Sequence, residues 1–167
     1  MSVAYDAMIF ARDVHKSQRR KYTNNPYTDH LAEVVGIAMS VGWRHAEIHP
    51  DNFMAVCWLH DCMEDQGVTA PGLIGLGMPF DVVDGVVMLS DMEQGTRAQR
   101  KAASRARLAT APGWVQTIKC ADLISNTSSI VQHDPKFSDV YLKEKRALLD
   151  VMTKADPRLR AIAIEMA

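Results

Sequence analysis

The sequence predicts an all-α fold, and three observations support this prediction. Apolar residues recur at helical spacing along nearly the whole chain. No segment alternates apolar and polar side chains for long enough to make a convincing strand. The 167 residues contain no repeat, low-complexity tract or linker, so residues 1–167 are expected to form a single domain. A chain of this length buries roughly 70% of its unfolded surface.

Periodicity and capping residues predict the first three helices. Residues 2–18 carry one apolar stripe, which is typical of an amphipathic helix. A second helix is expected near Thr28 and Asp29, either of which can cap it. Asp51 can cap a third helix, which is expected to continue until Gly67 stops it.

The second half of the chain keeps the helical period. Capping residues, prolines and apolar stripes predict further helices that begin near Thr69, Phe80, Thr96, Trp114, Pro135 and Pro157. The helix from Thr96 is basic and rich in alanine, and the helix from Trp114 is expected to end near Asn126. Residues 82–87 give the best rival strand signal, with Asp84-Gly85 as a hairpin turn, but the flanking segments are too short to support it.

The composition excludes several classes of function. Nineteen Lys and Arg residues against twenty Asp and Glu residues leave a net charge of −1, which gives no overall field toward nucleic acid or a membrane surface. A small anionic substrate stays open, because a local basic cluster would suffice. The three cysteines form no disulfide framework, and the first residues do not resemble a secretory signal, so a cytoplasmic protein is expected. Whether it forms a homo-oligomer stays open.

Ionisable side chains gather on a helical face that is apolar one turn earlier. On a continuous helix Val56, His60 and Glu64 are i,i+4 neighbours, and Asp61 and Asp65 form the adjacent row. Three carboxylates and an imidazole this close repel and desolvate one another unless a cation lies among them. A divalent metal ion is the simplest candidate, and a solvated helix end with capping acids is the alternative that this segment leaves open.

Two other positions bear on the choice between a metal ion and a solvated helix end, and the second of them favours the metal ion. His30 lies near the start of the apolar stripe of the second helix, where a lone histidine is more often structural. Asp122 lies on one helical row with Val115 and Ile118, where a carboxylate is costly without a partner and cannot act as a cap. Two imidazoles and two carboxylates form a mixed nitrogen and oxygen set, which suits Mn²⁺, Fe²⁺ or Zn²⁺ better than Ca²⁺ or Mg²⁺.

Basic residues precede the first histidine. Residues 18–21, Gln-Arg-Arg-Lys, lie where the first helix is expected to end, and positive charge is favourable at a helix C-terminus for that reason alone. The functional interpretation is a phosphate clamp beside the metal ion. Arg97, Arg100 and Lys101 could supply a second clamp, although a solvated helix face is the more common role of such a cluster.

Taken in order, these residues resemble a known family. Gln-x-Arg-Lys at 18–21 precedes Pro-Tyr-x-x-His at 26–30, Leu-His-Asp-x-x-Glu-Asp at 59–65 and Lys-x-Ala-Asp-x-x-x-Asn at 119–126. This order resembles the HD-domain hydrolases of guanosine tetra- and pentaphosphate, (p)ppGpp, which include the stand-alone small alarmone hydrolases of the stringent response. The His-Asp pair alone would indicate only the HD phosphohydrolase superfamily. The Glu-Asp pair and the final Asn are more specific.

The resemblance covers roughly residues 4–149 and implies an HD-type helical bundle. It implies a metal ion, usually Mn²⁺, bound by His30, His60, Asp61 and Asp122. Glu64 and Asp65 would position and activate the attacking water. Arg20 and Lys21 would hold the pyrophosphate, and Asn126 would contact the nucleoside. The implied reaction releases the 3′-pyrophosphate and leaves GDP or GTP.

The sequence departs from the family pattern at two positions and leaves alternatives open. Leu31 stands where the family usually has Pro, and Cys120 where Leu is usual, but neither change removes a functional group. A nucleotide phosphatase or an NADPH 2′-phosphatase would share the metal ligands, and only the Glu-Asp pair and the basic loop argue against it. A non-catalytic nucleotide-binding or antitoxin-like protein is a third interpretation, although Glu64 and Asp65 disfavour it. The roles of Arg97, Lys101 and Tyr141 stay open.

Overall fold

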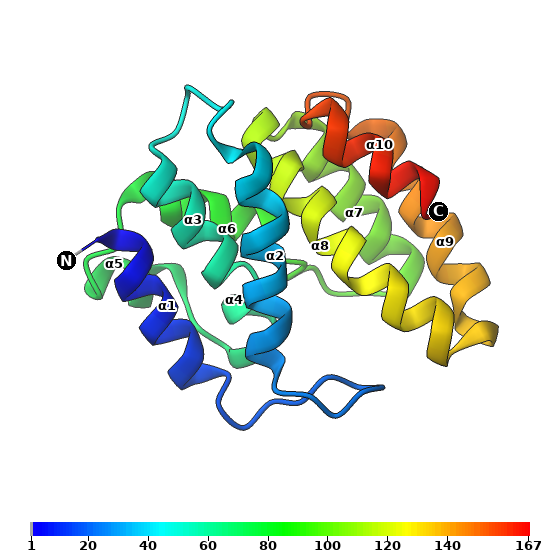
Figure 1. Cartoon of the computed structure of the whole chain (residues 1–167), viewed down its shortest axis with the longest axis horizontal. Helices are drawn as coiled ribbons and strands as arrows, with labels where there is room; N and C mark the ends of the chain where they lie inside the picture. Colours follow the sequence, from blue (N-terminus) through cyan, green and yellow to red (C-terminus); the bar gives the residue numbers. More distant parts are fainter. Residues whose placement is uncertain (1) are drawn as a thin grey trace.

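The computed structural model describes residues 2–167, which form ten helices and no strand (Figure 1). In chain order these are α1 (Val3–Val14), α2 (Tyr27–Gly42), α3 (Pro50–Leu59), α4 (Cys62–Gln66), α5 (Ala70–Gly75), α6 (Phe80–Leu89), α7 (Arg97–Thr110), α8 (Gly113–His133), α9 (Pro135–Val151) and α10 (Pro157–Glu165). The predicted all-α fold class is confirmed. Across this part of the chain, no helix is both long and apolar enough to traverse a bilayer.

Local sequence signals determine where many of the helices begin. The side chains of Ser2 and Thr69 each accept a hydrogen bond from an amide in the first turn of α1 and α5. Thr96 forms a capping box with Gln99 at the start of α7. Proline is the first residue of α3, α9 and α10, where its missing N–H would have had no partner.

The loop between α1 and α2 differs from the prediction. α1 ends at Val14 rather than at residue 18, because the chain then doubles back on itself. The Tyr27 amide donates to the Gln18 carbonyl at 3.0 Å, and the Arg20 amide donates to the Asn25 carbonyl at 2.9 Å. This loop carries the basic residues back to the start of α2.

The predicted caps of α2 and α3 are wrong in detail. α2 follows Pro26, so Thr28 and Asp29 lie inside its first turn. The cap of α3 is His49, whose side chain accepts from the amide of Asp51. The Asp51 carboxylate instead accepts the Val3 amide at 2.7 Å, which ties the start of α1 to α3.

The segment with the rival strand signal is helix α6. It packs closely on α8 at Gly85, where an added Cβ atom would lie 2.5 Å from the Trp114 ring. Only glycine allows this approach, so the residue that suggested a hairpin turn instead serves helix packing.

α8 is the central helix of the fold. It packs against α2, α6, α9 and α10, and it extends beyond the expected end at Asn126 to His133. Figure 1 shows α1 and α3–α6 on one side of α2, and α7–α10 on the other. Val115 and Ile118 are fully buried, and Asp122 on the same row is only 5% exposed. The expectation that this row is buried is confirmed.

Candidate metal centre and adjoining cavity

Three side chains from three helices meet in the core. His30 comes from the first turn of α2, His60 directly follows α3, and Asp122 comes from the middle of α8. One potential ligand atom from each lies within 4.8 Å of the other two, and all three residues are buried. Packing of α2 and α3, and of α2 and α8, brings together residues that are far apart in sequence. These three residues could therefore hold a metal ion.

Each of the two imidazoles turns its Nε2 atom toward this centre. Within residues 2–167 neither Nε2 atom forms a hydrogen bond, although carboxylate oxygens lie 3.1–3.9 Å away. A buried polar atom without a partner is unfavourable, and native structures contain few of them. Two such nitrogens that face carboxylate oxygens form a mixed donor set for a transition-metal cation. The residues present therefore fit a metal ion.

Asp61 lies beside the three clustered residues. Its Oδ2 atom is 3.1 Å from Nε2 of His60 and 3.5 Å from Nε2 of His30. The same oxygen accepts a hydrogen bond from the Tyr27 hydroxyl at 2.6 Å. Burial raises the pKa of Tyr27, so its hydroxyl keeps the proton that it donates.

The helix that was expected to run through this segment is broken. α3 ends at Leu59, and the backbone of Asp61 (φ −103°, ψ −2°) separates it from α4. Gly67 then ends α4 in the left-handed conformation, at φ 65°, as the sequence predicted. The break leaves the Cys57 carbonyl in the last turn of α3, where it accepts from His60 Nδ1 at 2.8 Å. The predicted row of His60 and Glu64 on one continuous helix is therefore wrong.

The carboxylates control the protonation of the histidines. Burial alone lowers the pKa of His60, but the negative charges of Asp61 and Asp122 raise it to about 9. Burial likewise opposes ionisation of Asp122, yet Lys119 and His30 hold its pKa well below the ordinary value. The centre therefore stabilises positive charge, which either protons or a metal ion can supply.

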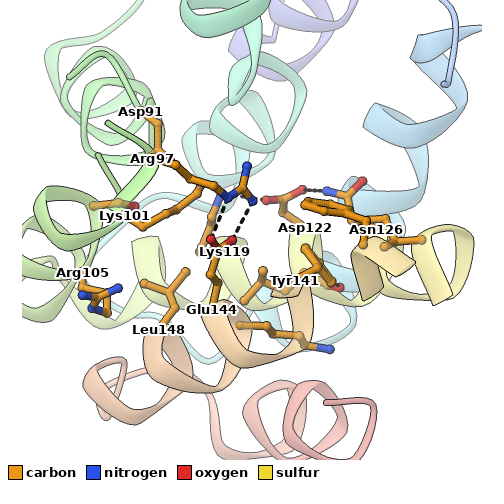
Figure 2. Close-up of a pocket in the computed structure, with 15 residues that line it drawn as sticks. Asp91, Arg97, Lys101, Arg105, Lys119, Asp122, Asn126, Tyr141, Glu144 and Leu148 are labelled. Atoms are coloured by element: carbon orange, nitrogen blue, oxygen red, sulfur yellow. Dashed lines mark hydrogen bonds and ion pairs between the residues drawn. The ribbon is translucent and has the colours of Figure 1, made fainter. Parts of the chain in front are cut away.

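Two further residues of α8 hold the Asp122 carboxylate. Lys119 donates to Oδ2 at 2.8 Å. Asn126 donates to Oδ1 at 2.6 Å (Figure 2). The helical period explains this, since positions three before and four after Asp122 lie on the same face. Sequence reasoning gave no role to Lys119 or to Tyr27, although both lie inside the quoted motifs. Their place in those motifs was the available signal.

The basic loop reaches the centre through one of its residues. Arg20 Nη1 donates to Asn126 Oδ1 at 2.9 Å, and the same amide donates to Asp122, so Asn126 links the guanidinium to the Asp122 carboxylate. Lys21 points elsewhere, with its side chain 74% exposed and its ammonium 3.6 Å from Asp134. The structure therefore brings Arg20, but not Lys21, into contact with the other candidate residues.

The two acids of α4 are held by different neighbours. Glu64 Oε2 accepts the Asp91 amide at 3.1 Å, and partial burial raises the pKa of the Glu64 carboxyl group despite the nearby Lys119. Asp65 Oδ2 accepts a hydrogen bond from the Gln18 side chain at 2.8 Å. The motif at residues 18–21 is therefore in direct contact with the Glu-Asp pair of α4. A carboxylate with a raised pKa is suited to accept a proton near neutral pH.

A cavity of about 310 Å³ adjoins Asp122 and Asn126 between α7, α8 and α9 (Figure 2). Its basic lining residues are Arg97, Lys101, Arg105, Lys119 and Lys145. The aromatic rings of Phe137 and Tyr141 also line it. Cations together with aromatic faces suit an anionic ligand that carries a ring.

Two cations of α7 that line the cavity, Arg97 and Lys101, already have carboxylate partners. Arg97 reaches across to Glu144 on α9, with two nitrogen–oxygen distances of 2.7 Å (Figure 2). Lys101 lies 3.0 Å from Asp91. Arg100, the third residue of the suggested second clamp, is exposed on α7. Arg97 and Lys101 therefore belong to the cavity wall rather than to a merely solvated face.

No protein-family model matches this sequence, and the search of curated proteins likewise gives no match. The structure is similar to a solved structure described by the words "A metazoan ortholog of SpoT hydrolyzes ppGpp and plays a role in starvation responses". The two superpose with a TM-score of 0.83, over 99% of this chain and 94% of that chain, at 22% sequence identity. At this identity the likeness shows a shared fold, and the chain therefore has the helical fold of that hydrolase.

Proposed function

We propose that this protein is a metal-dependent (p)ppGpp hydrolase, which releases the 3′-pyrophosphate of guanosine tetra- or pentaphosphate and leaves GDP or GTP. The observation that carries the proposal is the buried meeting of His30, His60 and Asp122. It is supported by the full-length similarity to a structure described as hydrolysing ppGpp and by the order of the four motifs in the sequence.

We assign the metal ion, Mn²⁺ by preference, to the four residues His30, His60, Asp61 and Asp122. The Nε2 atoms of both histidines, which accept and donate no hydrogen bond within residues 2–167, and the mixed nitrogen and oxygen set support this choice. When bound, such an ion polarises a phosphoryl oxygen and makes a water molecule more acidic.

The acids and the basic loop complete the reaction. Glu64 accepts the proton of the attacking water, for which its raised pKa suits it. Asp65, held by Gln18, orients that water. Arg20 donates hydrogen bonds to the phosphoryl oxygens and stabilises the charge that develops on them. Lys21, which is exposed in the free protein, turns toward the outer phosphate.

The nucleoside and its 5′-phosphates occupy the cavity beside Asn126. Arg97 and Lys101 exchange their carboxylate partners for the phosphate oxygens, and Tyr141 contacts the nucleoside. The cavity volume of about 310 Å³ lies at the lower end of the range for small-molecule sites.

We propose further that residues 1–167 act as one domain in the cytoplasm. The three cysteines, Cys57, Cys62 and Cys120, are buried free thiols, which supports a reducing compartment.

Product analysis tests the proposed reaction. The protein is incubated with Mn²⁺ and guanosine tetraphosphate, NADPH or simple nucleotides, and a sample stripped with a chelator serves as the control. Pyrophosphate and GDP from the tetraphosphate are expected, with no release in the stripped sample. Preferred turnover of NADPH or of simple nucleotides would replace the proposal with a different HD phosphohydrolase. Binding of the tetraphosphate without turnover would indicate a non-catalytic protein.

A further inference from the structure

Behind His30, on the side away from the carboxylates of the centre, two side chains form a hydrogen-bonded chain. The His30 Nδ1 atom lies 2.8 Å from Ser125 Oγ, and this hydroxyl donates to Glu33 Oε2 at 2.6 Å. Glu33 lies close to His30 on α2, and Ser125 lies on α8. Neither Glu33 nor Ser125 is a specified residue of the sequence motifs.

The number of protons sets the direction of this chain. A serine hydroxyl has one proton and two lone pairs, whereas an ionised carboxylate only accepts. Because the Ser125 proton goes to Glu33, Ser125 can only accept from His30. The His30 Nδ1 atom therefore carries a proton, and in a neutral ring the lone pair is then at Nε2, which faces Asp61 and Asp122.

We infer that Glu33 and Ser125 are positioning residues that fix the tautomer and ring orientation of His30 for metal binding. This inference rests on the metal site of the proposed function. An outer hydrogen bond of this kind orients a ligating histidine and makes it a better ligand.

Glu33 matters because it decides what the Ser125 hydroxyl does. Ser125 is 2% exposed, and its hydroxyl lies between His30 and Glu33. Without the Glu33 carboxylate the hydroxyl is free to rotate and to donate to His30 Nδ1. That rotation favours the other tautomer, in which the Nε2 atom carries the proton and cannot bind a metal ion.

His60 provides an internal comparison. Its Nδ1 atom donates to the main-chain carbonyl of Cys57 at 2.8 Å, and a carbonyl can only accept. The tautomer of His60 therefore does not depend on another side chain. Substitutions of Glu33 or Ser125 should change His30 and leave His60 as it is.

The affinity for Mn²⁺ alone, measured by competition with a chelator, tests the inference without any substrate. Ser125→Ala is expected to weaken Mn²⁺ binding about 10- to 100-fold, as for other outer-shell partners of a ligating histidine. Glu33→Ala is expected to weaken it less, because one serine rotamer still accepts. Glu33→Gln retains an acceptor oxygen and should change the affinity by less than about threefold.

The control is Ser128→Ala, on the same helix. Its hydroxyl donates to the Ser125 carbonyl at 3.3 Å and, in the described residues 2–167, takes no part in the His30–Ser125–Glu33 chain, so Mn²⁺ binding should match that of the wild type. Glu33 is exposed, so its variants are expected to fold even if Ser125→Ala does not. Circular dichroism of each variant checks the helical content.

The second measurement is the ¹⁵N spectrum of the imidazole rings in protein loaded with diamagnetic Zn²⁺. In the wild type and in Glu33→Gln, both histidines should show a protonated Nδ1. In Glu33→Ala the His30 signals should shift or broaden, while those of His60 stay in place.

The outcomes separate this inference from the proposed function. Wild-type protein that binds no Mn²⁺ would overturn the metal site and the positioning role together. If the wild type binds Mn²⁺ and Ser125→Ala, Glu33→Ala and Ser128→Ala all bind it with the same affinity, the positioning role alone would be overturned. Weakened Mn²⁺ binding in a protein that does not hydrolyse (p)ppGpp would support the positioning role and refute the proposed reaction.

Discussion

The metal centre and the cavity beside it handle their charges in different ways. In the centre, the Nε2 atoms of His30 and His60 face carboxylates and, over residues 2–167, form no hydrogen bond. In the cavity, Arg97 already has a bidentate partner in Glu144. The centre is therefore suited to a resident cation, whereas Arg97 and Lys101 of the cavity are already paired, and in the proposed function they exchange this pairing for the phosphates of the ligand. Variants that affect only one of the two regions can break this comparison.

The largest effect is expected for Asp122→Ala. Loss of this carboxylate should empty the metal site and lower the rate of hydrolysis by about 10³-fold or more, since a metal ion contributes several kcal/mol to such reactions. Elemental analysis and a pyrophosphate release assay measure the two effects. Asp150→Ala, which removes an exposed carboxylate on α9, is the matched control. Unchanged metal content in Asp122→Ala would refute the ligand assignment.

Glu64→Gln should separate metal binding from turnover. The substitution keeps the shape of the side chain but removes the proton acceptor, so kcat should fall about 10²-fold or more. The metal content should equal that of the wild type, because Glu64 is not among the assigned ligands. Normal turnover in this variant would remove Glu64 from the mechanism.

Arg20→Ala tests the link between the two regions. Arg20 should contribute charge-assisted hydrogen bonds to the substrate, so its loss is expected to raise KM about 10- to 100-fold. Arg19→Ala is the control, because Arg19 is the exposed neighbour on the same loop. Steady-state kinetics with guanosine tetraphosphate give both values. Equal KM values in the two variants would contradict the phosphate role of Arg20.

Lys145 makes the cavity side of the molecule sensitive to pH. Its ammonium is buried with Thr127 as its hydrogen-bond partner at 2.7 Å, and burial lowers the pKa of Lys145 to about 8. The unfolded chain then binds more protons between pH 8 and the ordinary lysine value, so stability rises with pH across that window.

Lys145→Met should remove this dependence. At pH 7 the variant is expected to gain on the order of 1 kcal/mol in the free energy of unfolding, because no ammonium is desolvated. The gain should vanish above about pH 10.5, where the wild-type lysine is neutral in both states. Urea unfolding at several pH values measures the difference. Lys143→Met, at an exposed position of α9, is the control and should show no such trend.

The smallest effect is expected for Glu144→Gln. Arg97 would no longer have to leave a carboxylate when phosphate arrives, so KM should fall by up to about fivefold, the usual limit for a partly exposed ion pair. The metal affinity should not change. An increase of KM would indicate that the ion pair shapes the cavity instead of competing with the ligand.

The sequence predicted the parts of the site that depend on helical period. The burial of Asp122 was predicted from its position on one helical row with Val115 and Ile118. The all-α fold class was predicted from the helical spacing of apolar residues over the whole chain. The metal set was a hypothesis from residue type and resemblance. The structure supports this hypothesis for three of the four residues, His30, His60 and Asp122, whose side chains are buried and meet.

The parts that the sequence could not predict depend on tertiary contacts. No proline or glycine near Asp61 signals a helix break, so the sequence did not predict that α3 ends here or that the Asp61 carboxylate meets Tyr27. Glu33 resembles any other exposed acid of a helix until its contact with Ser125 is seen. Lys145 falls within the apolar stripe of the helix that follows Pro135, but only packing against α8 shows that its ammonium is buried beside Thr127.

The hydrogen bond from His60 to the Cys57 carbonyl has an evolutionary consequence. Every amino acid supplies a main-chain carbonyl, so position 57 can be occupied by different buried residue types while the His60 ring keeps its orientation. The support of His30 has no such freedom, because it requires two compatible side chains. Among distant relatives, the residues at positions 33 and 125 should therefore change together, whereas the residue at position 57 should vary independently of His60.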